Sequence, residues 1–182
     1  MTAIADRYRR LADGLTRRVD AVPDNRWDDP SPCAEWTARD VLRHIIEGHE
    51  RVANNTDDSL SLKRSVDENP AVAWNEAREQ MTALLDDPQR AGREYDGMGG
   101  KTTVAKTVDG FIGFDLVVHG WDIARATGID DTIAAQDVAD AIKFAASLGD
   151  NLHSDGVCGP EVTVPDDAPD QDKLLGLLGR QP

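Results

Sequence analysis

The chain has 182 residues, of which 40% are hydrophobic and 30% are charged, as in ordinary soluble globular proteins. A chain of this length fits one domain, residues 1–182, and can bury roughly two-thirds of its unfolded surface. The formal net charge of −14, with no basic patch in the sequence, argues against nucleic acid as a partner, because a phosphate backbone demands clustered Lys and Arg side chains.

No segment is typical of export or of membrane insertion. The N-terminus is charged within a few residues and lacks the apolar stretch of a signal peptide. The most apolar run, FIGFDLVV, is too short to span a bilayer and contains an aspartate. The two cysteines, Cys33 and Cys158, do not make a disulfide framework. We therefore expect a cytoplasmic protein with reduced thiols and no membrane partner.

The first helix is expected over residues 4–22, where apolar side chains recur at spacings of three and four until Pro23 ends the pattern. A loop rich in Pro, Asp and Asn follows. Its two tryptophans, Trp27 and Trp36, are expected to fold back onto the helices.

A second helix is expected over residues 37–52, with Asp40 completing a shortened capping box at its start. A long polar loop occupies residues 53–69. Pro70 is suited to the first position of a third helix, since the missing N–H of proline costs nothing there, and Pro88 ends that helix.

Residues 89–102 are rich in glycine, and we expect an irregular connection. The GMGGK motif within them lacks the Walker spacing, which excludes a phosphate-binding loop. A fourth helix is expected over residues 103–127, with Gly128 as its C-terminal stop, and a fifth over residues 132–152. The tail contains one alternating stretch, EVTV, and a short closing helix in DQDKLLGLLG. These segments predict an all-α helix bundle.

The fourth helix carries ionisable residues on its apolar face. At about 100° per residue, Asp115, His119 and Asp122 fall within the arc that contains Val104 and Ile112. A buried carboxylate without a partner would cost several kcal/mol, on the order of its desolvation penalty. The i, i+4 pair of Asp115 and His119 can share a metal ion or form a buried hydrogen bond, and the spacing leaves both alternatives open.

The second helix offers two histidines as a further ligand. His49 lies in the middle of the apolar side, whereas His44 lies at its edge beside Arg43 and Glu47. On the pattern alone His49 is the better buried candidate, but it is equally explained as an ordinary core histidine.

The segment PSPCAEWTARDVLRHI, followed much later by FDLVVHGWDIARATG, resembles the metal-binding domain of the mycothiol-dependent maleylpyruvate isomerases, within the DinB-like helix bundles. The C-terminal segment from GPEVTV onward resembles a small single-domain subgroup of that family. The resemblance covers nearly the whole chain. It implies a DinB-like four-helix bundle with an additional C-terminal helical segment.

The resemblance also implies three metal ligands. His44, eight positions after the tryptophan of the WT motif, would be the first, and His119 of HGWD would be the third. Asp115 stands where the isomerases carry a glutamate. Because aspartate is one methylene shorter, the preferred metal can differ: zinc is expected, and nickel is the alternative.

The remaining polar and aromatic residues near these motifs have supporting roles under the same resemblance. Trp36 and Trp121 would wall the site and help to bind a cofactor. His49 would belong to the core or support a ligand, and Asp122 would orient a ligand or a helix end. Cys33 is expected to pack as a small apolar residue, with a nucleophilic or redox thiol as the alternative if it lies near the metal.

Three protein ligands leave a coordination position open, as in catalytic sites. The resemblance implies a metal-dependent mycothiol transferase or isomerase that acts on an unknown small substrate. The resemblance implies that the full isomerases are longer, with a second α/β domain after the bundle that we do not expect here, so maleylpyruvate itself is not assigned as the substrate. A non-catalytic metal-binding module is the alternative, and a homodimer formed through a helix face is compatible with either function.

Overall fold

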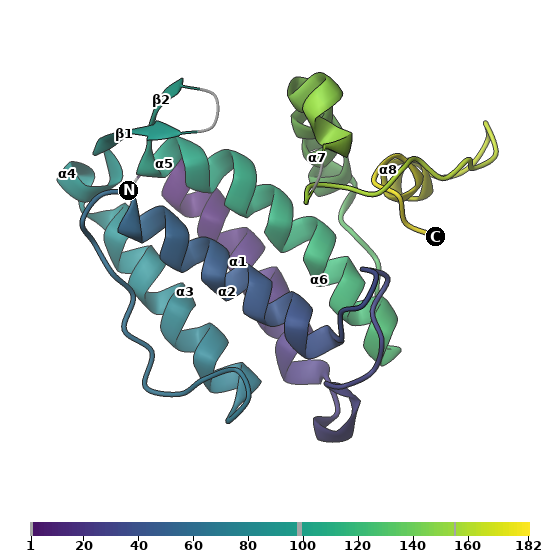
Figure 1. Ribbon diagram of the computed structural model, residues 1–182, viewed down its shortest axis with the longest axis horizontal. Coiled ribbons are helices and arrows are strands. Elements are labelled where there is room, and N and C mark those ends of the chain that lie inside the picture. Colours follow the sequence, from purple (N-terminus) through teal and green to yellow (C-terminus); the bar gives the residue numbers. More distant parts are fainter. Residues whose placement is uncertain (1, 98–99, 155) are drawn as a thin grey trace.

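The computed structural model describes residues 2–97, 100–154 and 156–182 (Figure 1). Its centre is a four-helix bundle in which α1 and α2 each pack against both α3 and α6. The four helices are α1 (Ala3–Ala21), α2 (Ala38–Asn54), α3 (Pro70–Asp86) and α6 (Gly113–Thr127). The predicted all-α bundle is confirmed. No helix in the described ranges is long and apolar enough to cross a membrane.

The C-terminal part of the chain lies outside the bundle, beside α6 (Figure 1). Helix α7 (Ala135–Leu148) packs on α6, and α8 (Asp170–Leu177) packs on α7. A short 3₁₀ helix, η3 (Gly149–His153), follows α7. The additional C-terminal helical segment is therefore present. As shown below, this segment also reaches back to α6.

The expectation of an irregular connection over residues 89–102 is wrong. After the single turn of α4 (Pro88–Ala91), the strands β1 (Glu94–Gly97) and β2 (Gly100–Thr103) pair as an antiparallel hairpin. Hydrophobic alternation does not reveal these strands, because most of their residues are polar or glycine. Residues 98 and 99 of the GMGGK motif lie outside the described residues.

The EVTV stretch, in contrast, is not a strand. Its Val162 N–H donates to the carbonyl of Gly176, 2.9 Å away, so the stretch runs against α8 instead of pairing with another strand. Val162 and Val164 of this stretch therefore lie against a helix and not in a sheet.

The predicted fourth helix contains a π turn. Helix α5 (Val104–Thr107) continues into the π segment η2 (Val108–Ile112) and then into α6. A π turn is one residue wider than an α turn, so the helix faces after it are rotated relative to those before it. Asp115 and His119 therefore lie at the edge of the buried face, with 26% and 12% of their side-chain surfaces exposed.

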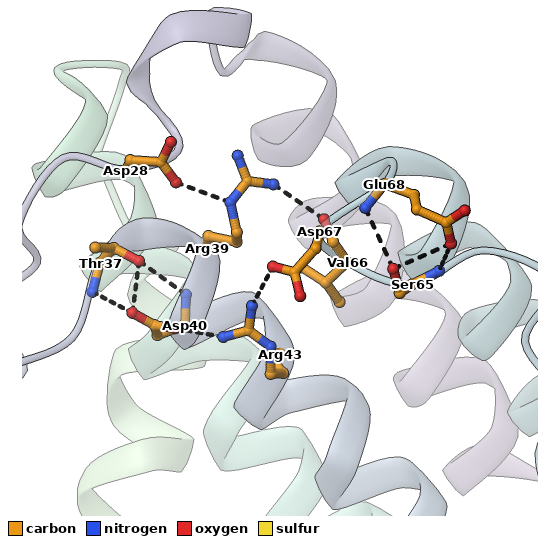
Figure 2. Close-up of polar contacts among 9 residues, drawn as sticks. All are labelled: Asp28, Thr37, Arg39, Asp40, Arg43, Ser65, Val66, Asp67 and Glu68. Atoms are coloured by element: carbon orange, nitrogen blue, oxygen red, sulfur yellow. Dashed lines mark hydrogen bonds and ion pairs between the residues drawn. The ribbon is translucent and has the colours of Figure 1, made fainter.

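The start of α2 is fixed by a capping box, as expected. Thr37 Oγ1 accepts from the Asp40 N–H at 3.2 Å, and the Asp40 carboxylate accepts from the Thr37 N–H at 2.9 Å (Figure 2). Hydrogen bonds from Thr37, with help from an ion pair to Arg43, hold the pKa of Asp40 below its usual range. The first turn of α2 is thereby held in one conformation.

Two arginines on α2 tie neighbouring loops to this helix (Figure 2). Arg39 donates to the Asp28 carboxylate at 2.8 Å and to the Val66 carbonyl at 3.0 Å. Arg43 donates to the Asp67 carboxylate at 2.6 Å. The N-terminal end of α2 is therefore held by the loops before and after it, which fixes the helix that carries His44.

His49 is a fully buried core residue. Its Nδ1 lies 2.7 Å from the Ile45 carbonyl, which can only accept, so Nδ1 carries the proton. Its Nε2 then accepts from the Tyr8 hydroxyl at 3.1 Å. Burial lowers the pKa of His49 to about 4, and the ring stays neutral at physiological pH. This hydrogen bond joins α1 to α2 inside the bundle.

We expect Tyr8→Phe to destabilise the protein by about 1–3 kcal/mol, because it leaves a buried imidazole nitrogen without a donor. Tyr95→Phe is the matched control, since the Tyr95 hydroxyl donates to Thr107 Oγ1 at a half-buried position. Urea denaturation of both variants measures the difference. Equal losses of unfolding free energy would contradict the role given to the Tyr8–His49 bond.

Candidate metal centre

Three side chains from two helices converge at the interface of α2 and α6. His44 comes from α2, and Asp115 and His119 come from successive turns of α6. One nitrogen or oxygen atom from each lies within 4.8 Å of the others. His44 Nε2 is 3.9 Å from Asp115 Oδ2, and the two imidazole rings are 5.0 Å apart. The structure thus brings together all three side chains that the resemblance indicated as ligands.

A glycine lies at the contact between the two helices. Gly48 lies one turn after His44 on α2. A Cβ atom at this position would lie 3.4 Å from Ile112 and 4.0 Å from the Asp115 carboxylate. Both are ordinary van der Waals distances, so Gly48 contributes a close but unstrained contact beside the Asp115 carboxylate.

The loop before α2 supplies one wall of the site. The Ser31 N–H donates to the Trp36 carbonyl at 2.8 Å, which closes the loop just before Thr37. The Trp36 ring lies 5.0 Å from His44 and 6.3 Å from His119, and 36% of this residue is exposed. An apolar face is thus offered to solvent directly beside the two imidazoles.

Trp121 occupies a different place from Trp36. It lies two residues after His119, about 200° around the helix, and it is fully buried. The Arg125 guanidinium stacks on its ring at 4.9 Å. This position makes Trp121 part of the packing behind α6, in contrast to Trp36 at the mouth of the site.

A buried carboxylate stands behind His119. Asp122 is fully buried, and its Oδ2 accepts from His119 Nδ1 at 2.8 Å. Arg180 donates to the same carboxylate through Nε at 3.1 Å and Nη2 at 2.8 Å. Burial alone would raise the pKa of Asp122, but the bonds from His119 and Arg180 lower it to about 2. Since Asp122 is ionised and can only accept, Nδ1 of His119 carries the proton and Nε2 is the nitrogen left for a ligand.

Cys33 also lies in this cluster. Its thiol donates to Asp122 Oδ2 at 3.3 Å, and its Sγ is 4.0 Å from His119 Nδ1. Cys33, His119 and Asp122 form a second group whose atoms are close enough for a metal ion. The Arg180 guanidinium already supplies the positive charge there, with Nη2 3.6 Å from the Cys33 sulfur. Of the two groups, the one formed by His44, Asp115 and His119 is therefore better suited to a metal cation.

The charge states of the first group differ between its members. Burial and the neighbouring His119 lower the pKa of His44 to about 4, so this ring is neutral at pH 7. Burial also raises the pKa of Asp115. Burial would lower the pKa of His119, but the hydrogen bonds with Asp122 and Cys33 and the charge of Asp115 raise it to about 10. Without a metal, His119 therefore holds a proton that a metal would displace.

Arg180 is the residue that sequence reasoning missed. It lies 58 positions after Asp122, in a part of the chain where no motif or helical spacing points towards the site. The one available signal is general: a buried carboxylate in an apolar helix face needs a cation, but the sequence does not say which arginine supplies it.

The chain is similar to a known family of domains and to curated relatives. The model of the family "Mycothiol maleylpyruvate isomerase N-terminal domain" matches residues 8–124, which contain the three candidate ligands. Two curated proteins of Mycobacterium tuberculosis, from strains CDC 1551 and H37Rv, are each 26% identical to the chain over 187 residues. The alignment covers 95% of this chain and 95% of each relative, and both relatives are named as uncharacterized.

No solved structure matches the chain significantly. The family match covers well over half of the sequence, including all four helices of the bundle in whole or in large part. The chain therefore belongs to the mycothiol maleylpyruvate isomerase N-terminal domain family.

Proposed function

We propose that this protein binds one divalent metal ion, zinc or alternatively nickel, through His44, Asp115 and His119. We further propose that it acts as a mycothiol-dependent transferase or isomerase on a small substrate. The observation that carries the proposal is the convergence of the three side chains between α2 and α6. The family match supports a mycothiol-related, metal-binding role.

The donor set fits such an ion. Two imidazoles and one carboxylate are typical ligands of catalytic zinc, which keeps a further position open for a water or substrate. His44 offers a neutral ring, and the Asp122 carboxylate orients the His119 ring through Nδ1. Histidine ligands of metals usually donate their second N–H to a carboxylate or carbonyl in this way.

The surroundings of the three ligands suit a thiol cosubstrate. When bound, the metal would supply a positive charge that lowers the pKa of a thiol and favours its nucleophilic thiolate form. Trp36 would contact the organic part of the thiol through its exposed ring face. Asp122 would hold the His119 ring in place through its bond with Nδ1.

A non-catalytic metal-binding module is the second candidate. Such a module needs no substrate cavity at the ligands, and none of the three ligands lines the cavity of about 530 Å³ between α1 and α6 or the one of about 240 Å³ between α1 and α3. Titration of the zinc-loaded protein with mycothiol separates the candidates. The enzyme requires binding that is lost when the thiol is S-methylated, whereas the module requires no binding of either compound.

Variants of the ligands test the metal site itself. We expect His44→Ala and His119→Ala to lose stoichiometric zinc, because each removes one of three ligands. Cys33→Ser should retain zinc, since Cys33 belongs to the group that already holds Arg180. Elemental analysis of protein purified without a metal-affinity tag gives the occupancy. Loss of zinc in Cys33→Ser with retention in His44→Ala would reverse the assignment.

Zinc binding should depend on pH in a defined direction. The pKa of metal-free His119 is about 10, so zinc must displace a proton at any lower pH, while His44, with a pKa of about 4, needs no deprotonation near neutrality. The affinity should therefore rise roughly tenfold per pH unit from about pH 6 to about pH 9. Calorimetry in buffers of different ionisation enthalpy should detect about one released proton. A pH-independent affinity would contradict the protonation state given to His119.

A further inference from the structure

Arg180 is a buried arginine that donates to the Asp122 carboxylate behind His119. Only 8% of the residue is exposed. Nε and Nη2 donate to the Asp122 carboxylate, and Nη1 donates to the Leu178 carbonyl at 2.8 Å. A planar guanidinium that makes two contacts with one carboxylate fixes the orientation of that carboxylate. A lysine, which acts as a point charge, does not fix it.

The end of α8 places Arg180 in this position. Gly179 has a φ of +80°, and its N–H donates to the Gly176 carbonyl at 3.0 Å. The Arg180 N–H then donates to the Leu175 carbonyl at 2.9 Å, which completes a Schellman motif. A Cβ on Gly179 would lie 2.9 Å from the Gly159 backbone, so only glycine allows this turn without a shift. The turn that ends α8 therefore places the Arg180 side chain against Asp122 of α6.

We propose that Arg180 is a positioning residue for the metal centre, acting on His119 through Asp122. This inference rests on the metal site proposed above, and it assigns a role to a residue outside the matched family region, which ends at residue 124. Arg180 holds the Asp122 carboxylate, and Asp122 accepts from His119 Nδ1. The His119 ring is thereby kept with Nε2 available to the metal. The C-terminal segment thus completes a site whose ligands all lie in the bundle.

The alternative is that Arg180 only fastens α8 to the bundle. Gln171 provides a matched control for this alternative. Its side chain accepts from the Ile133 N–H at 2.8 Å and donates to the Asp131 carbonyl at 3.3 Å, so it also anchors α8 but does not contact Asp122 or His119. Gln171→Ala should loosen the same segment while leaving the chain of contacts to His119 intact.

Zinc affinity, measured on the full chain by competition with a chromogenic chelator, tests the proposal. Arg180→Met should weaken zinc binding about 10–100-fold, as expected for loss of a group that orients a metal ligand. Arg180→Lys should restore part of the affinity, because it returns the charge without the two-nitrogen contact. Gln171→Ala should lower the thermal midpoint but keep the zinc affinity within about twofold of the wild type.

The Asp122→Asn background shows whether Arg180 acts through Asp122. There, Arg180→Met should change the zinc affinity by less than about twofold, because the carboxylate that it orients is already absent. If Arg180→Met does not fold, Arg180→Lys decides: weaker binding supports the proposal, and wild-type affinity overturns it. Equal losses in Gln171→Ala and Arg180→Met would also overturn it. A wild-type protein that binds no zinc would instead overturn the proposed function, and this inference with it.

Discussion

The charge of Asp122 is the constraint on which the candidate site depends. A fully buried carboxylate is unfavourable unless hydrogen bonds and an opposite charge compensate for its lost hydration. Asp122 obtains both, from His119 on its own helix, from Cys33 in the loop before α2 and from Arg180 at the end of the chain. Three segments that are distant in the sequence are thereby joined at one carboxylate. Breaking this cluster would disturb the site and the packing of the C-terminal segment together.

The same cluster gives the two sides of His119 different functions. Nδ1 is engaged inside the protein by Asp122, which leaves Nε2 without that bond, and the ring lies 5.0 Å from that of His44 across the space between α2 and α6. His44 and Asp115 border that space, and Trp36 covers one side of it. The protein thus combines a closely hydrogen-bonded polar cluster with an adjacent group of three potential metal ligands. A metal site with an open position requires both parts: groups that hold a ligand in place, and ligands that leave one coordination position free.

Much of the fold follows from local patterns in the sequence. Helical periodicity and the capping signals at Thr37 and Pro70 locate the helices of the bundle to within a few residues. The hairpin of β1 and β2 could not be predicted in this way, because its stability comes from pairing between polar strands instead of from an apolar face. The π turn η2 also escapes a helical wheel, which assumes a constant angle per residue.

The candidate site is less accessible to sequence reasoning than the fold. Spacing places Asp115 and His119 on one face, but the choice between His44 and His49 rested on family resemblance. The structure supplies a physical basis for that choice, since His49 is fully buried and uses both ring nitrogens within the core. The contact of Arg180 with Asp122 depends on how α8 docks, and no local pattern encodes a docking geometry.

The most direct test is X-ray absorption spectroscopy of the zinc-loaded protein with and without mycothiol. The account predicts only nitrogen and oxygen neighbours, at about 2.0–2.2 Å, in the protein alone, and one additional sulfur neighbour at about 2.3 Å after mycothiol is added. A sulfur neighbour in the thiol-free protein would make a cysteine of the chain, Cys33 or Cys158, a ligand and contradict the assignment. An unchanged spectrum with mycothiol would contradict the role of the metal in thiol binding.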